Sequence, residues 1–132
     1  MKKIAMLNCL KANEVCGGVA CLRAFNAREA GFARYAGEEL QLMGFLRCSN
    51  CGKKPEEDRG MKEKLERLVS VGTEAVHIGI CAQMNDVKCE TMGSYAEWLE
   101  DHGVEVVWRT HDWARPKPGE RKPPKPEERN TP

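Results

Sequence analysis

Residues 74–81 read Glu-Ala-Val-His-Ile-Gly-Ile-Cys, and this apolar, β-branched stretch decides the fold class. A short run of this kind is typical of a strand that is covered on both faces of a parallel sheet. Amphipathic patterns on either side of it predict helices over residues 58–71 and 91–102. Gly72 and Gly103 follow these two helices as stop signals. The stretch is therefore expected to be a strand between two helices.

The same alternation continues outward from this strand. Residues 3–9 and 40–46 are predicted to be earlier strands, residues 19–35 a helix between them, and residues 104–108 the last strand. This β-α-β-α-β-α-β order predicts a three-layer α/β fold with a four-stranded parallel sheet. By analogy with flavodoxin-like and Rossmann-like sheets, we expect the strand order 2-1-3-4.

Composition changes sharply after this pattern ends. Residues 114–132 hold six of the seven prolines and no bulky apolar side chain, so they cannot bury a core. We expect residues 1–113 to form the α/β domain and residues 114–132 to be a disordered tail.

The overall composition limits which partners the protein can bind and in which compartment it is expected. The 132 residues are 41% hydrophobic and 31% charged, and the formal net charge is +1. This balance gives no electrostatic basis for binding nucleic acid or an anionic membrane. No apolar run approaches the roughly 18 residues that span a bilayer, and the first one is too short for a signal peptide. We therefore expect a cytoplasmic protein without nucleic-acid or membrane partners.

Cysteine is the residue type that departs from ordinary usage, with seven copies: Cys9, Cys16, Cys21, Cys48, Cys51, Cys81 and Cys89. In a reducing compartment this density indicates metal or thiol chemistry rather than a set of disulfides. Three of the cysteines end the first three predicted strands, and the others follow in the loops that leave the same edge. Open α/β sheets build their sites at this carboxyl edge. All seven thiols are thus expected on one rim.

The spacing of the cysteines suggests one ligand set. Cys48 and Cys51 have the C-x-x-C spacing that lets two thiolates bind a single ion, and Cys9 and Cys81 end the two central strands. We expect these four residues to bind a metal ion, zinc rather than an iron–sulfur cluster. The remaining candidates for a further metal or thiol site are Cys16, Cys21, Cys89 and His111.

Two other functions remain open. Cys48 and Cys51 could instead cycle between dithiol and disulfide, although no helix starts directly after them to activate a thiol. The chain could also be an interaction domain in which the cysteines are merely tolerated. His77 lies in mid-strand and is expected to be a hydrogen-bonded core residue. No Ser/His/Asp set, paired catalytic carboxylates or phosphate-binding loop is visible, so the sequence leaves open whether the protein is an enzyme.

Several short segments in order resemble the CGGC-domain family, small α/β proteins of bacteria and archaea. They are the strand ending at Cys9, the segment from Cys16 to Asn26, residues 45–51, the strand leading to Cys81, and residues 103–111. The family's Cys-Gly-Gly-Cys motif stands here as Cys-Ser-Asn-Cys at residues 48–51. The resemblance covers about residues 3–111 and implies metal binding, with zinc as the expected ion.

Overall fold

The sheet has four parallel strands in the order β2-β1-β3-β4, as predicted. The computed structural model describes residues 1–49, 51–83 and 88–111, so the predicted tail at 114–132 lies outside the described residues. The strands are β1 (Lys2–Asn8), β2 (Leu40–Arg47), β3 (Ala75–Ile78) and β4 (Glu105–Val107). Because all four strands run in the same direction, their carboxyl ends lie at one edge of the sheet.

In the described residues, three α-helices and four short 3₁₀ turns connect the strands. The helices are α1 (Val19–Ala27), α2 (Arg59–Ser70) and α3 (Glu90–Asp101). The turns are η1 (Leu10–Glu14), η2 (Ala30–Tyr35), η3 (Pro55–Glu57) and η4 (Ile80–Ala82). In the described part of the chain, no helix combines the length and apolar character needed to cross a bilayer.

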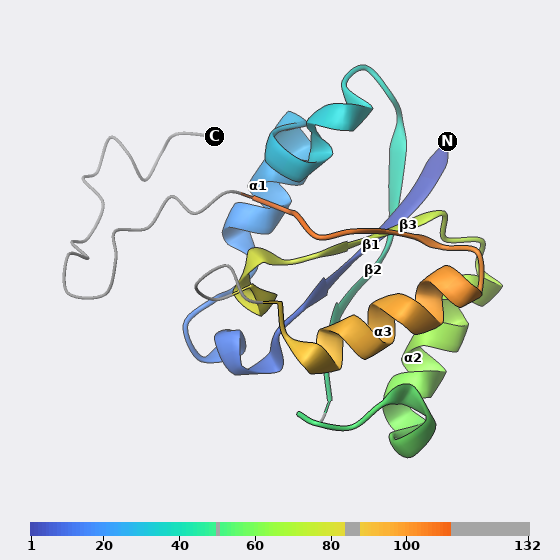
Figure 1. Cartoon of the computed structure of the whole chain (residues 1–132). Helices are drawn as coiled ribbons and strands as arrows, with labels where there is room; N and C mark the ends of the chain where they lie inside the picture. The colour runs from blue at the N-terminus through green and yellow to red at the C-terminus, as the bar shows by residue number, and fades with distance from the viewer. Residues whose placement is uncertain (50, 84–87, 112–132) are drawn as a thin grey trace.

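The helices cover both faces of the sheet, which gives the predicted three layers (Figure 1). Alternate residues of β1 point to opposite faces. Ala5 and Leu7 pack in the cluster under α2 and α3, whereas Ile4 and Met6 pack in the cluster under α1 and η2. This burial on both sides explains why β1 and β3 are continuous apolar runs in the sequence.

The single helix predicted over residues 19–35 is wrong, because the chain breaks between α1 and η2. Arg28 ends α1 in the left-handed region, with φ of 56°. Its guanidinium donates to the carbonyls of Phe25 and Glu38, which holds the reversal in place. Beyond the break, Gly31 N–H donates to the Thr110 carbonyl at 2.9 Å. The break thus brings η2 against the segment that follows β4.

The strand predicted over residues 74–81 is also shorter than expected. It ends at Ile78, and η4 follows after Gly79. A Cβ at Gly79 would lie 2.0 Å from the Asn8 side-chain oxygen, so only glycine allows this close approach. The short turn therefore places Cys81 on a 3₁₀ turn beside the end of β1, rather than on a strand.

Candidate thiol site

The backbone just after β1 connects the thiols that follow its two neighbouring strands. Cys9 N–H donates to the Cys81 sulfur at 3.3 Å, and Leu10 N–H donates to the Cys48 sulfur at 3.2 Å. Cys48 directly follows β2, and Cys81 lies in η4 after β3. Two successive peptide groups thus hold one sulfur on each side of β1. N–H donors stabilise a sulfur most when it is charged, as in a thiolate.

Four of the cysteines gather on the side of α2 and α3. Cys48 is only 6% exposed and belongs to the core cluster under these helices, against which Cys9 and Cys89 pack. The backbone N–H of Gly52 donates to the Thr91 hydroxyl at 2.8 Å. This bond ties the residue after Cys51 to the first turn of α3, just after Cys89. We call Cys9, Cys48, Cys51 and Cys89 the α3-side thiols.

The electrostatics of Cys48 agree with this grouping. Burial raises the pKa of Cys48, the Leu10 N–H lowers it, and the charges of Cys9, Cys51 and Cys89 raise it. The cysteines whose charges affect the pKa of Cys48 are therefore the three other α3-side thiols. Because its pKa is raised, a metal ion that binds Cys48 has to displace a proton.

The other buried thiol, Cys21, lies on the α1 side of the sheet. Cys21 is 4% exposed and packs in the cluster under α1. Its sulfur lies 3.7 Å from the Asn8 Oδ1 atom and 3.2 Å from the Thr110 hydroxyl. The Cys81 sulfur lies 3.9 Å from the same Asn8 Oδ1 atom. We call Asn8, Cys21, Cys81 and Thr110 the Asn8 cluster.

The two thiols of the Asn8 cluster are also shifted towards the protonated form. Burial raises the pKa of Cys21, the Thr110 contact lowers it, and the charge of Cys16 raises it. Burial raises the pKa of Cys81 as well, with the Cys9 N–H lowering it and the charges of Cys9, Cys21 and Cys16 raising it. Cys16 itself accepts the Gly18 N–H at 3.4 Å. The seven cysteines are all free thiols.

The donor set fits a thiophilic metal, but its side chains are not yet arranged around one. Within residues 1–49, 51–83 and 88–111, no three Cys, His, Asp or Glu side chains converge in a metal-ligand arrangement. The Cys48 and Cys81 sulfurs instead contact the backbone after β1. A change of χ1 rotamer moves a cysteine sulfur without moving the backbone. Metal binding at this edge therefore requires the thiols to turn towards one another.

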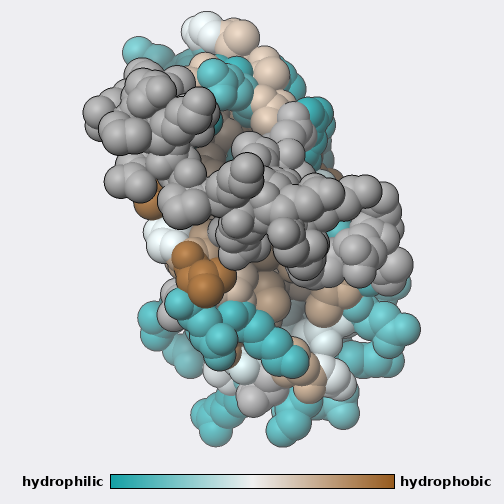
Figure 2. Space-filling model, turned by 90° about the vertical axis from the view of Figure 1, so that its left-hand side faces the viewer, coloured by the Kyte–Doolittle hydropathy of each residue, from teal (hydrophilic) through white to brown (hydrophobic). Residues whose placement is uncertain are grey.

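Three apolar side chains are exposed between the end of β1 and the first residue of α1, near the exposed Lys11 and Glu14. Leu10, Val15 and Val19 are 45%, 72% and 74% exposed. The view from the side towards which β1 and β3 run shows strongly hydrophobic side chains beside hydrophilic ones (Figure 2). Some exposed apolar side chains thus lie beside the thiol-bearing edge.

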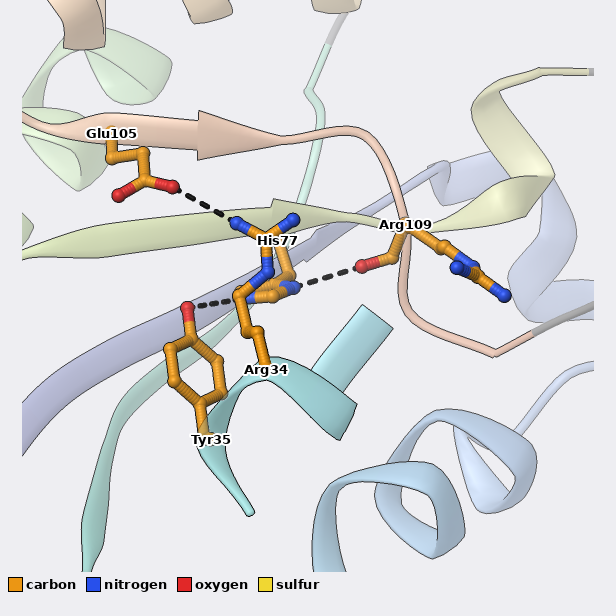
Figure 3. Close-up of polar contacts among 5 residues, drawn as sticks. All are labelled: Arg34, Tyr35, His77, Glu105 and Arg109. Carbon is orange, nitrogen blue, oxygen red and sulfur yellow. Dashed lines mark hydrogen bonds and ion pairs between the residues drawn. The ribbon is translucent and has the colours of Figure 1, made fainter. Parts of the chain in front are cut away.

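His77 is a buried core residue, as expected, and it links three segments (Figure 3). Its Nδ1 atom lies 2.8 Å from the Arg109 carbonyl, and its Nε2 atom lies 2.7 Å from the Tyr35 hydroxyl. A carbonyl only accepts, so Nδ1 carries the proton, and the Tyr35 hydroxyl donates to Nε2. Arg34, next to Tyr35, reaches Glu105 of β4 at 3.0 Å. His77 therefore fixes the exit from β4, which carries Thr110.

Of the other two histidines, His102 lies at the opposite end of α3 from Cys89. His102 follows the last turn of α3, and its Nδ1 atom lies 2.7 Å from the Trp98 carbonyl, as expected for a residue at a helix C-terminus. His111 is half-buried at the end of the described chain.

Two residues of the site were missed by the sequence reasoning. Asn8 is a polar residue at the end of an apolar strand, next to Cys9, and its position could have marked it as functional. Thr110 gave no such signal, because its contact with Cys21 depends on the reversal at Arg28 and on the packing of η2.

Comparisons with known proteins identify the family. A family model described as a CGGC domain matches residues 3–111, a range that includes all seven cysteines and runs beyond β4. Comparison with curated proteins and with solved structures finds no match. The motif order, the parallel sheet and the family match agree, and the chain belongs to the CGGC-domain family.

Proposed function

We propose that the protein binds a zinc ion through thiolates of the α3-side thiols. The observation that carries this proposal is the Gly52–Thr91 hydrogen bond, which joins the C-x-x-C loop to the start of α3 beside Cys89. Together with the packing of Cys9 and Cys89 against the cluster of Cys48, it puts four thiols on one side of the sheet. Four thiolates are a complete ligand set for a structural zinc.

This ligand set differs from the predicted one at a single position. The sequence suggested Cys81 as the fourth ligand, because it follows the other central strand. In the structure Cys81 contacts Asn8 and shares that amide with Cys21, whereas Cys89 lies among the neighbours of Cys48. We therefore propose Cys89 as the fourth ligand, with Cys9, Cys48 and Cys51 as the others.

The local surroundings support metal binding over disulfide cycling. A redox cysteine needs a stabilised thiolate, but burial raises the pKa of Cys48. The other thiol of the pair, Cys51, is exposed and no helix begins at it. A metal ion, in contrast, displaces the thiol protons on binding and needs no thiolate beforehand.

Elemental analysis of protein purified without oxygen tests this proposal. We expect about one zinc per chain in the wild type and none in the Cys48→Ser/Cys51→Ser variant. Because Cys89 completes the set, Cys89→Ser is expected to lower zinc affinity by at least about 10-fold in competition with a chromophoric chelator, as typical ligand-shell losses do. Cys81→Ser is expected to keep the wild-type affinity.

His102→Gln is the matched control, because it removes a metal-binding side chain at the opposite end of α3 and should leave the zinc content unchanged. If the protein instead contains iron and has a coloured absorption spectrum, the site binds an iron–sulfur cluster, and the zinc proposal is overturned. Metal-free protein with a reversible disulfide between Cys48 and Cys51 would favour the thiol–disulfide function instead. Loss of zinc in Cys81→Ser but not in Cys89→Ser would restore the ligand set that the sequence suggested.

A further inference from the structure

The Asn8 cluster contains two thiols that the proposed zinc site does not use, Cys21, which is buried, and Cys81, which is half-buried. Cys21 of α1 and Cys81 of η4 both lie near Asn8, the last residue of β1. Thr110, from the segment after β4, contacts Cys21. Asn8 is 5% exposed. The missing side chain of Gly79 makes room for it, since a Cβ there would lie 2.0 Å from Asn8 Oδ1 and 3.1 Å from the Cys81 sulfur. The chain thus builds a specific polar cluster inside its core.

The Asn8 amide is poorly matched to two protonated thiols. Its oxygen lies near both sulfurs, but in the described part of the chain its buried NH₂ group has no hydrogen-bond partner. An unpaired buried donor costs about 1–3 kcal/mol, while an S–H group is only a weak donor. Cys21 has one proton and two acceptors within reach, Asn8 and Thr110, so it cannot donate to both at once. Stability alone does not explain an amide in this orientation.

The same amide matches two thiolates well. A thiolate only accepts hydrogen bonds, and the two ends of an amide have nearly the same shape. A half-turn of the Asn8 side chain would point its NH₂ group at both sulfurs and leave the carbonyl oxygen, the less costly group, without a partner. Thr110 could then donate its hydroxyl proton to Cys21, because a hydroxyl both donates and accepts. With Asn8 turned in this way, the amide and the hydroxyl match deprotonated thiols, whose formation burial opposes until a cation binds.

We propose that Cys21 and Cys81 form a second metal site, which binds a soft monovalent cation of the Cu(I) class as a dithiolate, with Asn8 as the residue that positions both sulfurs. This inference rests on the proposed function in one respect: it takes the zinc ligands to be thiols other than Cys21 and Cys81. Two thiols lie near the Asn8 amide, too few for a four-coordinate zinc, and soft ions of this class favour thiolate ligands. On binding, each thiol releases its proton to water, two metal–sulfur bonds form, and no electron is transferred. The single negative charge that remains faces the Asn8 NH₂ group.

The test uses the Cys48→Ser/Cys51→Ser variant of the full chain, so that the zinc site is absent. Cu(I) is added without oxygen in competition with a chromophoric Cu(I) chelator. We expect this variant to retain one strongly bound Cu(I) per chain, and the further change Cys21→Ser or Cys81→Ser to abolish it. Asn8→Ala is expected to lower the Cu(I) affinity about 10–100-fold, the usual effect of losing a residue that orients metal ligands.

Cys16→Ser is the matched control, because Cys16 is a neighbouring thiol outside the Asn8 cluster, and this change is expected to leave Cu(I) binding intact. Circular dichroism shows whether each variant folds; if Asn8→Ala does not, the two cysteine variants decide. Binding that survives both Cys21→Ser and Cys81→Ser, or that is lost in Cys16→Ser, would overturn the second site. The two proposals fail in different ways. If the proposed function is wrong, the Cys48→Ser/Cys51→Ser variant does not lose zinc; if the second site is wrong, this variant loses zinc but its Cu(I) binding does not depend on Cys21 and Cys81.

Discussion

Gly31→Ala is expected to lower the free energy of unfolding by about 3 kcal/mol, the upper part of the usual range for overpacking. A Cβ at this position would lie 2.3 Å from the Arg109 carbonyl oxygen and 3.1 Å from the Thr110 carbonyl oxygen. Both contacts are with backbone, which cannot turn aside as a flexible side chain can. The added methyl group would therefore push η2 away from the segment after β4 and break the bond from Gly31 N–H to Thr110.

Gly93→Ala is the matched control for this prediction. Gly93 lies inside α3, and a Cβ there has no described atom within 4 Å. The change removes a flexible residue from a helix interior, so it is expected to stabilise the protein by about 0.5–1 kcal/mol. Urea denaturation of both variants measures the two effects. Equal stability of Gly31→Ala and the wild type would mean that η2 and the exit from β4 do not approach as closely as described.

Loss of stability between neutral and mildly acidic pH is the second expected result, and His77 is its cause. Burial lowers the pKa of His77 below its ordinary value of 6.5; the Arg109 carbonyl and Glu105 oppose this effect, and Arg34 and Lys2 add to it. Below about pH 6.5 the unfolded chain takes up a proton that the folded chain does not. The free energy of unfolding is therefore expected to fall with pH, by at most about 1.4 kcal/mol per unit, until the lowered pKa is reached.

Two substitutions isolate the contribution of His77. His77→Leu leaves the Arg109 carbonyl and the Tyr35 hydroxyl without this partner, which is expected to cost about 3 kcal/mol at pH 7.5 and to flatten the dependence on pH. Tyr35→Phe removes one of the two hydrogen bonds and is expected to cost about 1 kcal/mol while the pH dependence persists. Chemical denaturation at several pH values between 5 and 8 measures both. If the free energy of unfolding of His77→Leu depends on pH as steeply as that of the wild type, a group other than His77 causes the dependence.

Much of the fold could be predicted from the sequence because its signals are local. Strands buried on both faces, such as β1 and β3, are continuous apolar runs, and glycines mark the ends of α2 and α3. The break at Arg28 could not be predicted, since arginine rarely adopts a positive φ and the bond that holds η2 in place comes from Thr110, far along the chain. The early end of β3 depends likewise on the approach of Asn8 to Gly79.

The candidate site was predictable at the level of the sheet edge but not of the ligand set. Parallel strands bring Cys9, Cys48 and Cys81 to the same edge, which the alternating pattern already implied. Which thiols become neighbours depends on loop contacts, such as the Gly52–Thr91 bond, and on which face of the sheet each side chain joins. Cys21 and Cys89 come from the starts of helices on opposite faces, and the sequence alone does not reveal this division.

X-ray absorption at the zinc edge, on protein purified without oxygen, tests the central claim most directly. Thiolate ligation by Cys9, Cys48, Cys51 and Cys89 predicts a shell of sulfur atoms at about 2.3 Å from the zinc ion. This shell is expected to disappear in the Cys48→Ser/Cys51→Ser variant. A shell of only nitrogen or oxygen atoms at about 2.0–2.1 Å, or protein that carries no metal, would contradict the account.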